Sequence, residues 1–207
     1  VMDNNLSIVL LGKAGVGKSA SANTILGRAA FESKESFGPV TKNISVETGT
    51  AFGKNVSVID TPDIQGSEEQ IKNFCQFFLQ DFKPSLFLLV IQIGRFTEED
   101  NKAVEAATRV LGPERLKNCF LLFTGGDSLE TTLQNYISDC RTSSLPEVVK
   151  AFSWRIHLFN NKDGGQEQVR ELLLKSGHLT TVYYFSKCQK WITKLLFSTF
   201  YLFFVQL

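Results

Sequence analysis

The 207-residue sequence has almost no net charge, since 22 Lys and Arg residues oppose 21 Asp and Glu residues, for a balance of +1. Nucleic-acid-binding domains are usually strongly basic, so no nucleic acid partner is expected. The spacing of the four cysteines matches neither a metal-ligand nor a redox motif: Cys75, Cys119, Cys140 and Cys188. We therefore expect reduced thiols in a cytoplasmic protein. A signal peptide is not expected either, because the apolar run of residues 8–11 is short and ends at a glycine.

Short apolar runs alternate with helical patterns along the chain, whose length fits one α/β domain. Strands are predicted at residues 6–11, 43–52, 56–59, 86–91, 119–123 and 156–159. Helices are predicted at residues 19–26, 68–81, 97–111, 131–141 and 166–175. The second and third strands should form a hairpin around residues 53–55. Continuous apolar strands separated by helices predict a mostly parallel sheet covered on both faces.

The first turn of this pattern matches the phosphate-loop motif G-x-x-x-x-G-K-[ST], in the residues Gly12, Lys13, Ala14, Gly15, Val16, Gly17, Lys18 and Ser19. Its glycines let backbone N–H groups surround phosphates, and the helix that follows, which includes Ala20, presents its positive end to negative charge. Lys18 is expected to reach the β- and γ-phosphates, and the Ser19 hydroxyl to bind Mg²⁺. A glycine-rich turn with an exposed lysine is the alternative, but the motif lies between a strand and a helix, as its function requires.

Two further elements are expected to hold the metal. Asp60 ends an apolar strand and can bind Mg²⁺ through water, although it could also be a plain strand-to-turn aspartate. Asp63 stands where GTPases usually carry a glycine that contacts the γ-phosphate. Thr41 is the best candidate for a hydroxyl that closes on Mg²⁺ and the γ-phosphate, while Ser33 and Ser36 are other hydroxyls of the same loop.

The base site departs from the motif N/T-K-x-D, in which a carboxylate accepts hydrogen bonds from guanine. The sequence here is Thr124, Gly125, Gly126 and Asp127, so glycine replaces the lysine. Asp127 is either the base-binding carboxylate or a helix-capping aspartate. Asn160 and Asn161 follow the next strand, where amide groups can make a second base contact.

Several segments resemble the GIMAP family of septin-like GTPases associated with immunity. Residues 12–28 are similar to its phosphate loop, and residues 31–34 follow at the family's spacing. Residues 60–63 look like its third motif, residues 94–100 its signature box and residues 159–162 its last motif. The resemblance covers about residues 6–175. It implies a three-layer Ras-like P-loop NTPase domain over residues 1–176, with one antiparallel edge strand.

The resemblance also implies a function. GIMAP proteins bind GTP or GDP with Mg²⁺, hydrolyse GTP slowly or not detectably, and form nucleotide-dependent dimers or oligomers. We therefore expect a GTP/GDP-controlled assembly switch with weak hydrolysis, in which Lys18, Ser19 and Thr41 act at the phosphates and the metal. A GTP- or GDP-binding scaffold without hydrolysis is the alternative, and an ATP-using P-loop protein a weaker one.

One departure from the family and one from GTPases in general affect these expectations. Alignment on Leu129 puts Ser128 at the usual aspartate position of the base site, and we expect Asp127 to take over recognition. No glutamine directly follows Asp63, since Gln65 is two positions on. Arg95 is a speculative arginine finger, and a salt bridge at the start of a helix is the other interpretation. Slow turnover is expected without such a finger.

Residues 177–207 do not resemble the family and end in a strongly apolar tail. Counting from Trp191 gives 17 residues, with Lys194 among them, whereas a bilayer span needs about 20. Three interpretations remain open: membrane contact through residues 191–207, a helix packed on the domain or a partner, and residues that are not part of a native exon. Family members sit on intracellular membranes, so we expect a cytoplasmic protein on the cytosolic face of such a membrane.

Overall fold

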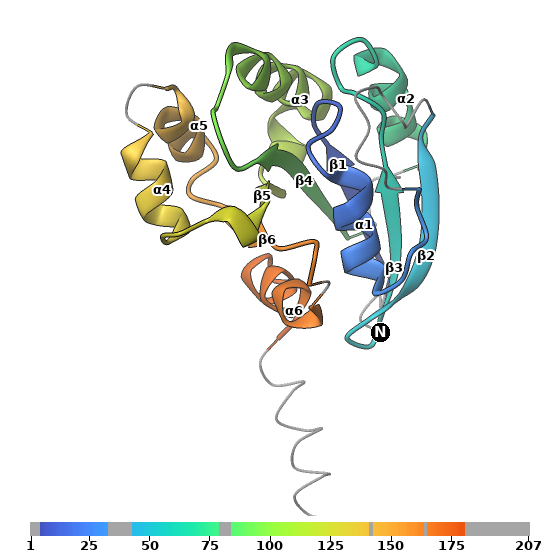
Figure 1. The fold of residues 1–207 in the computed structure, drawn as a ribbon. Helices are drawn as coiled ribbons and strands as arrows, with labels where there is room; N and C mark the ends of the chain where they lie inside the picture. Colours follow the sequence, from blue (N-terminus) through green and yellow to red (C-terminus); the bar gives the residue numbers. More distant parts are fainter. Residues whose placement is uncertain (1–4, 33–42, 79–83, 141–142, 164, 181–207) are drawn as a thin grey trace, which may run out of the picture. The chain divides into compact units, whose positions relative to one another are not determined.

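The computed structural model describes residues 5–32, 43–78, 84–140, 143–163 and 165–180 (Figure 1). Contacts divide the chain into two units, Val1–Val169 and Arg170–Leu207, which are described separately. The first unit contains a six-stranded sheet with the order β2-β3-β1-β4-β5-β6. The strands are β1 (Asn5–Leu11), β2 (Ser45–Ala51), β3 (Lys54–Asp60), β4 (Ser85–Gln92), β5 (Cys119–Thr124) and β6 (Ile156–Phe159).

Strand directions confirm the predicted sheet. β2 pairs antiparallel with β3 at one edge, and every other pair of neighbouring strands is parallel. The hairpin turns at Phe52 and Gly53, which both have positive φ. Parallel neighbours require crossover connections, and the intervening helices provide them. The α/β class and the single antiparallel edge strand are therefore as the sequence predicted.

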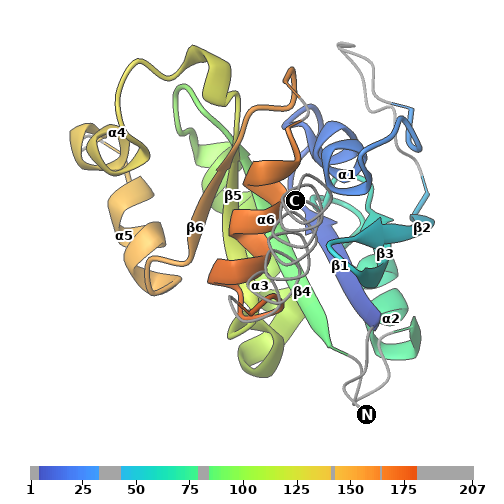
Figure 2. The ribbon, with the colours of Figure 1, turned by 90° about the horizontal axis from the view of Figure 1, so that it is seen from below.

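The helices are α1 (Lys18–Leu26), α2 (Glu68–Phe78), α3 (Glu98–Leu116), α4 (Leu133–Asp139), α5 (Leu145–Ala151) and α6 (Gln166–Lys175). Helix α1 contacts β1, β2 and β3, and α2 packs on α3. Figure 2 shows α1 and α2 on opposite sides of β1 and β3, so helices cover both faces of the sheet. This is the three-layer arrangement that the sequence predicted.

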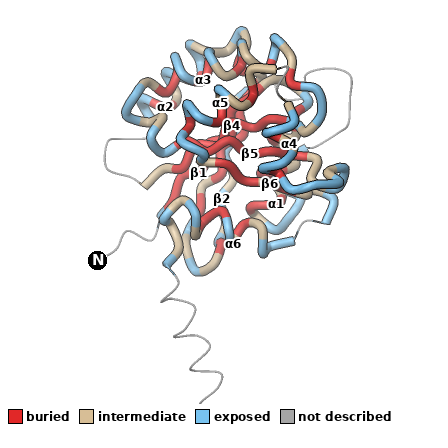
Figure 3. The backbone as a smooth tube through the Cα atoms, turned by 90° about the vertical axis from the view of Figure 1, so that its left-hand side faces the viewer, coloured by how far each residue is buried: buried red, intermediate tan, exposed pale blue. Residues whose placement is uncertain are grey.

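The main core lies on the α2–α3 side of the sheet. Val9, Ile59, Phe87 and Leu121 point from four strands into one cluster that also contains residues of α2, α3, α4 and α5. Side chains alternate along a strand, so Ile8 and Leu10 on β1 face the other layer. Both sets are fully buried, and the strands form the buried centre of Figure 3. Burial on both faces explains the uninterrupted apolar runs in the sequence.

Helix α3 begins as the sequence predicted and ends later. The Thr97 hydroxyl accepts from the backbone N–H of Asp100, whose carboxylate accepts from the backbone N–H of Thr97, which is a capping box. The predicted stop at Gly112 is instead a break, with φ 64° and ψ 173°, after which helical structure continues from Pro113 to Leu116. Proline suits the first turn of a helix because its missing N–H would be unpaired there.

Other bounds also differ from the prediction. The helix predicted at residues 131–141 is the shorter α4, which begins after Thr132, whose side chain caps it. Helix α5 and the 3₁₀ turn Gly126–Ser128 were not predicted. Both are short, and short segments carry little periodicity to detect.

In the second unit, the C-terminal end of α6 closes with a glycine. Gly177 has φ 75°, and its N–H donates to Leu174 while the N–H of His178 donates to Leu173, as in a Schellman motif. Residues 181–207, including the predicted membrane-contacting segment, lie outside the described residues. Within the described part of the chain, no helix is long and apolar enough to span a bilayer. The predicted boundary at residue 176 stays a prediction.

Candidate functional site

The candidate site lies where the parallel strands end. The phosphate loop follows β1, residues 61–65 follow Asp60 at the end of β3, residues 93–97 follow β4, residues 125–128 follow Thr124 at the end of β5, and residues 160–163 follow β6. The carboxyl ends of parallel strands meet at one edge of a sheet, where open α/β sheets bind their ligands. Five loops that are far apart in the sequence are therefore gathered at one edge.

The phosphate loop closes around its own lysine. Lys18 Nζ donates to the backbone carbonyl oxygens of Gly12 (2.9 Å) and Lys13 (2.7 Å). Burial lowers the pKa of the Lys18 ammonium, and the nearby carboxylates of Asp60 and Asp63 oppose this effect. A partly desolvated ammonium held by two carbonyls is prepared to exchange them for phosphate oxygens.

Two glycines shape this loop. A Cβ at Gly12 would lie 2.7 Å from the carbonyl oxygen of Val90, and the φ of Gly12 is +144°. Gly17 has φ +93° and precedes the first helical residue of α1. Side chains are disfavoured at such φ values, so both positions require glycine. The loop thus brings backbone N–H groups and the helix N-terminus to one place, where phosphate binds favourably.

The residues predicted to hold Mg²⁺ meet directly. Ser19 Oγ donates to a carboxylate oxygen of Asp60 at 2.5 Å, although 41 positions separate the two residues. Asp60 is 2% exposed. Mg²⁺ prefers hard oxygen ligands and retains several waters, so a hydroxyl and a carboxylate at this distance fit its chemistry. The described residues contain no cluster of three or more His, Cys, Asp or Glu side chains that could hold a metal.

Contacts with α3 and with the end of β5 hold the phosphate loop in place. Lys13 Nζ lies 2.7 Å from a carboxylate oxygen of Asp100, in the first turn of α3. The hydroxyl of Thr124, at the end of β5, donates to the carbonyl oxygen of Val16 at 2.7 Å. Ala14 and Gly15 lie at the more exposed tip of the loop, and Ala20 is half-buried in the first turn of α1.

The segment after Asp60 also forms hydrogen bonds within the protein. Asp63 accepts from the backbone N–H of Gln65 (3.0 Å), which directs this carboxylate into its own turn. The Gln65 side-chain amide donates to the carbonyl oxygen of Glu99 (2.8 Å). Ile64 N donates to the Gly12 carbonyl at 3.2 Å. The Gln65 side chain is therefore hydrogen-bonded to α3 in this arrangement.

Asp127 lies in the 3₁₀ turn after β5 and forms an ion pair with Lys162, from the loop after β6. The hydrogen bond from Lys162 holds the pKa of the Asp127 carboxyl below its usual value. The turn is entered through Gly125, whose φ is +81°, and Gly126 packs against β6. The Asp127 carboxylate therefore lies at the carboxyl edge of the sheet, between the loops after β5 and β6, and its predicted contact with the base stays a prediction.

The two asparagines of the neighbouring loop make contacts within the protein. Asn160 donates to Asp163 (2.7 Å) and accepts from the backbone N–H of Lys162 (3.0 Å). Asn161 accepts from the hydroxyl of Thr24 (2.9 Å) and donates to Ser21 (3.1 Å) in α1. Both carboxamides hold the loop in shape, and their predicted contact with the base stays a prediction. Thr41, Ser33 and Ser36 lie outside the described residues.

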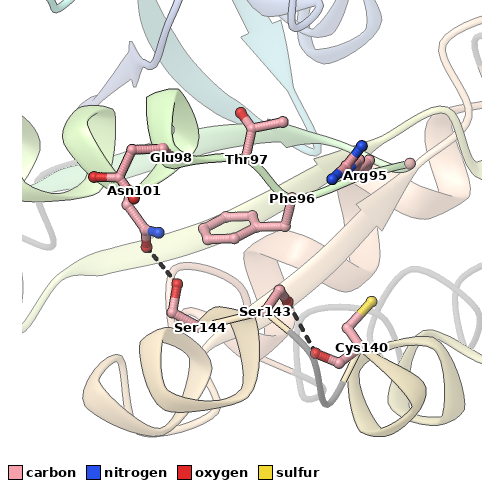
Figure 4. Close-up of a pocket in the computed structure, with 9 residues that line it drawn as sticks. Arg95, Phe96, Thr97, Glu98, Asn101, Cys140, Ser143 and Ser144 are labelled. Atoms are coloured by element: carbon pink, nitrogen blue, oxygen red, sulfur yellow. Dashed lines mark hydrogen bonds between the residues drawn. The ribbon is translucent and has the colours of Figure 1, made fainter.

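A pocket of about 460 Å³ lies next to these loops (Figure 4). Arg95, Phe96 and Asn101 line one side of it, and Cys140 and Ser144 the other. The Ser144 hydroxyl donates to the Asn101 side chain at 2.6 Å. The pocket shares the first turn of α3 with the Lys13–Asp100 pair, but the phosphate loop does not line it.

Sequence reasoning named Thr124 as part of the base motif but missed the contacts that Asp100, Thr124 and Lys162 make in this site. Lys162 had a signal, since it directly follows the two asparagines assigned to the base. Asp100 and Thr124 had none, because their partners Lys13 and Val16 are about a hundred positions away. Pairing at that separation depends on tertiary structure alone.

Together, the sheet order and the phosphate loop at its carboxyl edge define a Ras-like P-loop nucleotide-binding domain. A family model described as the AIG1 family matches residues 6–181. The chain belongs to the AIG1 family.

Curated relatives agree with this assignment. The chain is 42% identical over 173 residues to GTPase IMAP family member 8 of Rattus norvegicus, covering 80% of this chain and 25% of the relative. Identity to the Homo sapiens protein of the same name is 37% over 183 residues, covering 83% and 27%. Immune-associated nucleotide-binding protein 9 of Arabidopsis thaliana is 33% identical over 181 residues, covering 81% and 53%. The chain thus spans about a quarter to a half of these relatives.

Solved structures show the same fold. Toc33 from Arabidopsis thaliana, in complex with GDP and Mg²⁺, superposes with a TM-score of 0.58 at 24% identity, covering 76% of this chain and 71% of that one. Toc33 in complex with Mg²⁺ and GMPPNP gives a TM-score of 0.63 at 20% identity, covering 84% and 85%. At this identity the likeness establishes the fold.

Proposed function

We propose that this chain is a guanine nucleotide-binding protein whose GTP- and GDP-bound states control its assembly, and that it hydrolyses GTP slowly. The observation that carries the proposal is the Ser19–Asp60 pair beside the buried Lys18, which together form a phosphate and metal site. Membership of the AIG1 family, with relatives named GTPases, supports guanosine as the nucleoside.

Each part of the site has a role in this proposal. Phosphate oxygens replace the Gly12 and Lys13 carbonyls as partners of Lys18. Ser19 and Asp60 hold Mg²⁺, which neutralises charge on the β- and γ-phosphate oxygens when it is bound. Asp127 accepts hydrogen bonds from the guanine N–H groups. Thr41 supplies the hydroxyl that closes on the metal in the GTP state.

Assembly is proposed to proceed through a nucleotide-dependent homodimer or oligomer. The description of one solved Toc33 structure states that dimerization is important for the GTPase activity of the chloroplast translocon components atToc33 and psToc159. Another is a dimerization-deficient mutant in which arginine was replaced by alanine. Here Arg95 is exposed in the loop after β4, at the same sheet edge as the phosphate loop. It is the residue that we propose reaches a partner's nucleotide.

A scaffold that binds GTP or GDP without hydrolysis is the second candidate. The observation that favours it is the Gln65 side chain, which is hydrogen-bonded to the Glu99 carbonyl. A glutamine in that arrangement does not orient an attacking water, and water positioning is one of the elements on which GTP hydrolysis depends.

The deciding experiment titrates the full chain with fluorescent GDP, GMPPNP and ADP in the presence of Mg²⁺. We expect tight binding of both guanine nucleotides and weak binding of ADP. Lys18→Ala should weaken GDP binding about 10- to 100-fold, because charge-assisted hydrogen bonds to phosphate are lost. Equal affinity for ADP and GDP would refute the guanine assignment, and no binding of either would refute the nucleotide site.

Assembly is tested by light scattering of the same samples. We expect a larger mass with GMPPNP than with GDP, and loss of that difference in Arg95→Ala. Lys102→Ala is the matched control, since Lys102 is an exposed cation of α3 outside these loops. An unchanged mass in every nucleotide state would remove the assembly switch and leave the nucleotide-binding function.

We further infer that the chain is cytoplasmic and contacts the cytosolic face of an intracellular membrane through residues 191–207. Support for this comes from the apolar sequence of that segment and from the lysines that precede it. Flotation of the full chain with phospholipid vesicles, compared with a chain ending at residue 176, tests the inference. Equal flotation of both proteins would contradict it.

A further inference from the structure

An ion pair joins the two loops that border the proposed base site. Lys162 Nζ lies 2.5 Å from one carboxylate oxygen of Asp127, with the lysine side chain 73% exposed and the aspartate 28% exposed. The pair connects the end of β5 to the end of β6, across 35 positions of the sequence. An exposed ion pair of this kind adds little to the folding stability of a protein. We therefore ask how it affects the binding of a ligand that contacts the same carboxylate.

Several contacts fix the backbone from which Lys162 extends. The backbone N–H and carbonyl of Asn160 are both bound by the side chain of Gln168, at 2.8 and 3.0 Å. The Asn160 side chain accepts from the backbone N–H of Lys162, which forms a tight turn. The Asn161 side chain is hydrogen-bonded to Ser21 and Thr24 of α1. The loop therefore presents Lys162 toward Asp127 without the ordering cost that a free loop would carry.

The structure also explains why a lysine does not occupy position 126. A Cβ at Gly126 would lie 3.2 Å from the carbonyl oxygen of Phe159 and 3.2 Å from Leu158 Cγ. The first contact is with backbone of β6, which cannot move aside as a side chain can. In the alignment on Leu129, which puts Ser128 at the aspartate position of N/T-K-x-D, the lysine falls at position 126; with Asp127 as the aspartate it falls at Gly125. The close approach of the 3₁₀ turn to β6 thus disfavours the usual lysine.

We propose that Lys162 is a specificity-determining residue of the base site. From the loop after β6, it supplies the cation that position 126 lacks, and it holds the Asp127 carboxylate oriented toward guanine. This inference rests on the proposed function, in which Asp127 reads the base.

The chemistry of the carboxylate supports this role. An ionised carboxylate has about four acceptor positions on its two oxygens, so a lysine on one oxygen leaves room for two guanine N–H groups. Adenine presents an acceptor at N1 and has no amine at C2, so an ionised carboxylate repels it. The hydrogen bond from Lys162 lowers the pKa of the Asp127 carboxyl, which agrees with the ionised form that selects guanine.

The experiment compares GDP and ADP affinities of the full chain in four proteins: wild type, Lys162→Gln, Lys162→Arg and Asp127→Asn. Lys162→Gln should weaken GDP binding up to about fivefold, as expected for loss of one exposed charge contact, and leave ADP binding unchanged. Lys162→Arg should restore most of the affinity. A merely structural role would alter GDP and ADP binding together and would lower the thermal midpoint.

The double variant Lys162→Gln/Asp127→Asn ties the effect to the carboxylate. If Lys162 acts through Asp127, the lysine substitution should change GDP affinity little in the Asp127→Asn background. Unchanged GDP affinity in Lys162→Gln, or an equal loss in both backgrounds, would overturn the inference.

Xanthosine diphosphate separates this inference from the proposed function on which it rests. Xanthine carries a carbonyl where guanine carries the 2-amino group, so Asp127→Asn should lose GDP and gain xanthosine diphosphate. If it does neither, Asp127 does not read the base, and both proposals fail. If the swap occurs but Lys162→Gln behaves as wild type, only the role of Lys162 is overturned.

Discussion

Lys13 of the phosphate loop and Asp100 of α3 form an ion pair with 2.7 Å between nitrogen and oxygen, although 87 positions separate them. The other carboxylate oxygen of Asp100 accepts from the backbone N–H of Thr97 (2.8 Å) and from its hydroxyl (2.7 Å). One carboxylate therefore caps α3 and anchors the loop that would hold phosphates. A change at Asp100 affects both the helix and the nucleotide site.

Asp100→Asn is expected to destabilise the protein by about 1–3 kcal/mol, because it leaves the half-buried Lys13 ammonium without its counter-charge. Urea denaturation followed by circular dichroism measures this loss. Glu98→Gln is the control, as it changes an exposed carboxylate in the same turn. Equal stabilities of Asp100→Asn and wild type would show that the ion pair contributes nothing.

The Ser19–Asp60 pair should control how nucleotide binding depends on Mg²⁺. Ser19→Ala removes a hydroxyl ligand, so GDP affinity with Mg²⁺ should fall about tenfold or more, while affinity in EDTA should change little. Calorimetry with and without Mg²⁺ measures the difference. Ser57→Ala on β3 provides a control outside the loops. A loss of equal size in EDTA would contradict a metal role for Ser19.

Gly126→Ala tests the crowding against β6. The added Cβ meets a backbone carbonyl at 3.2 Å, so we expect destabilisation of about 1–3 kcal/mol. Gly165→Ala is the matched control, since a Cβ there meets nothing within 4 Å. Thermal or urea unfolding compares the two variants. The explanation for the missing lysine is wrong if Gly126→Ala is as stable as Gly165→Ala.

Gln65→Ala should leave GTP turnover within about twofold of wild type, because its amide is bound to Glu99 and not to water. A residue that positions the attacking water would instead cost on the order of 10²-fold when removed. Phosphate release under multiple-turnover conditions distinguishes these outcomes. A large loss would mean that Gln65 moves away from Glu99 in the GTP state.

The cysteines should differ in reactivity. Burial raises the pKa of Cys75 to about 11 and that of Cys119 to about 12, so both thiols stay protonated and unreactive at about pH 8. Cys140 is half-exposed beside the pocket and should react first among these three. Iodoacetamide labelling of the native protein, read by peptide mass mapping, tests the order. Rapid labelling of Cys119 would contradict the burial.

Local sequence determined much of this protein. The glycines at positions 12 and 17 specify a loop that side chains would block, and the alternation of apolar runs with helical patterns specifies a mostly parallel α/β sheet. The Thr97 capping box was readable because its partners are three residues apart. Nearby residues carry such signals, since they depend on backbone geometry that neighbours share.

Tertiary structure decided how the loops combine. The pair Lys13–Asp100 joins the phosphate loop to α3, and the pair Asp127–Lys162 joins the loops after β5 and β6, but no local pattern in the sequence shows that these side chains meet. The hydrogen bond between Asn161 and α1 likewise cannot be predicted from the sequence, because the two segments meet only in the folded sheet. The carboxyl ends of parallel strands lie at one edge of the sheet, whatever the sequence of the loops that follow them. The packing of the strands and helices therefore determines which of the delivered side chains touch.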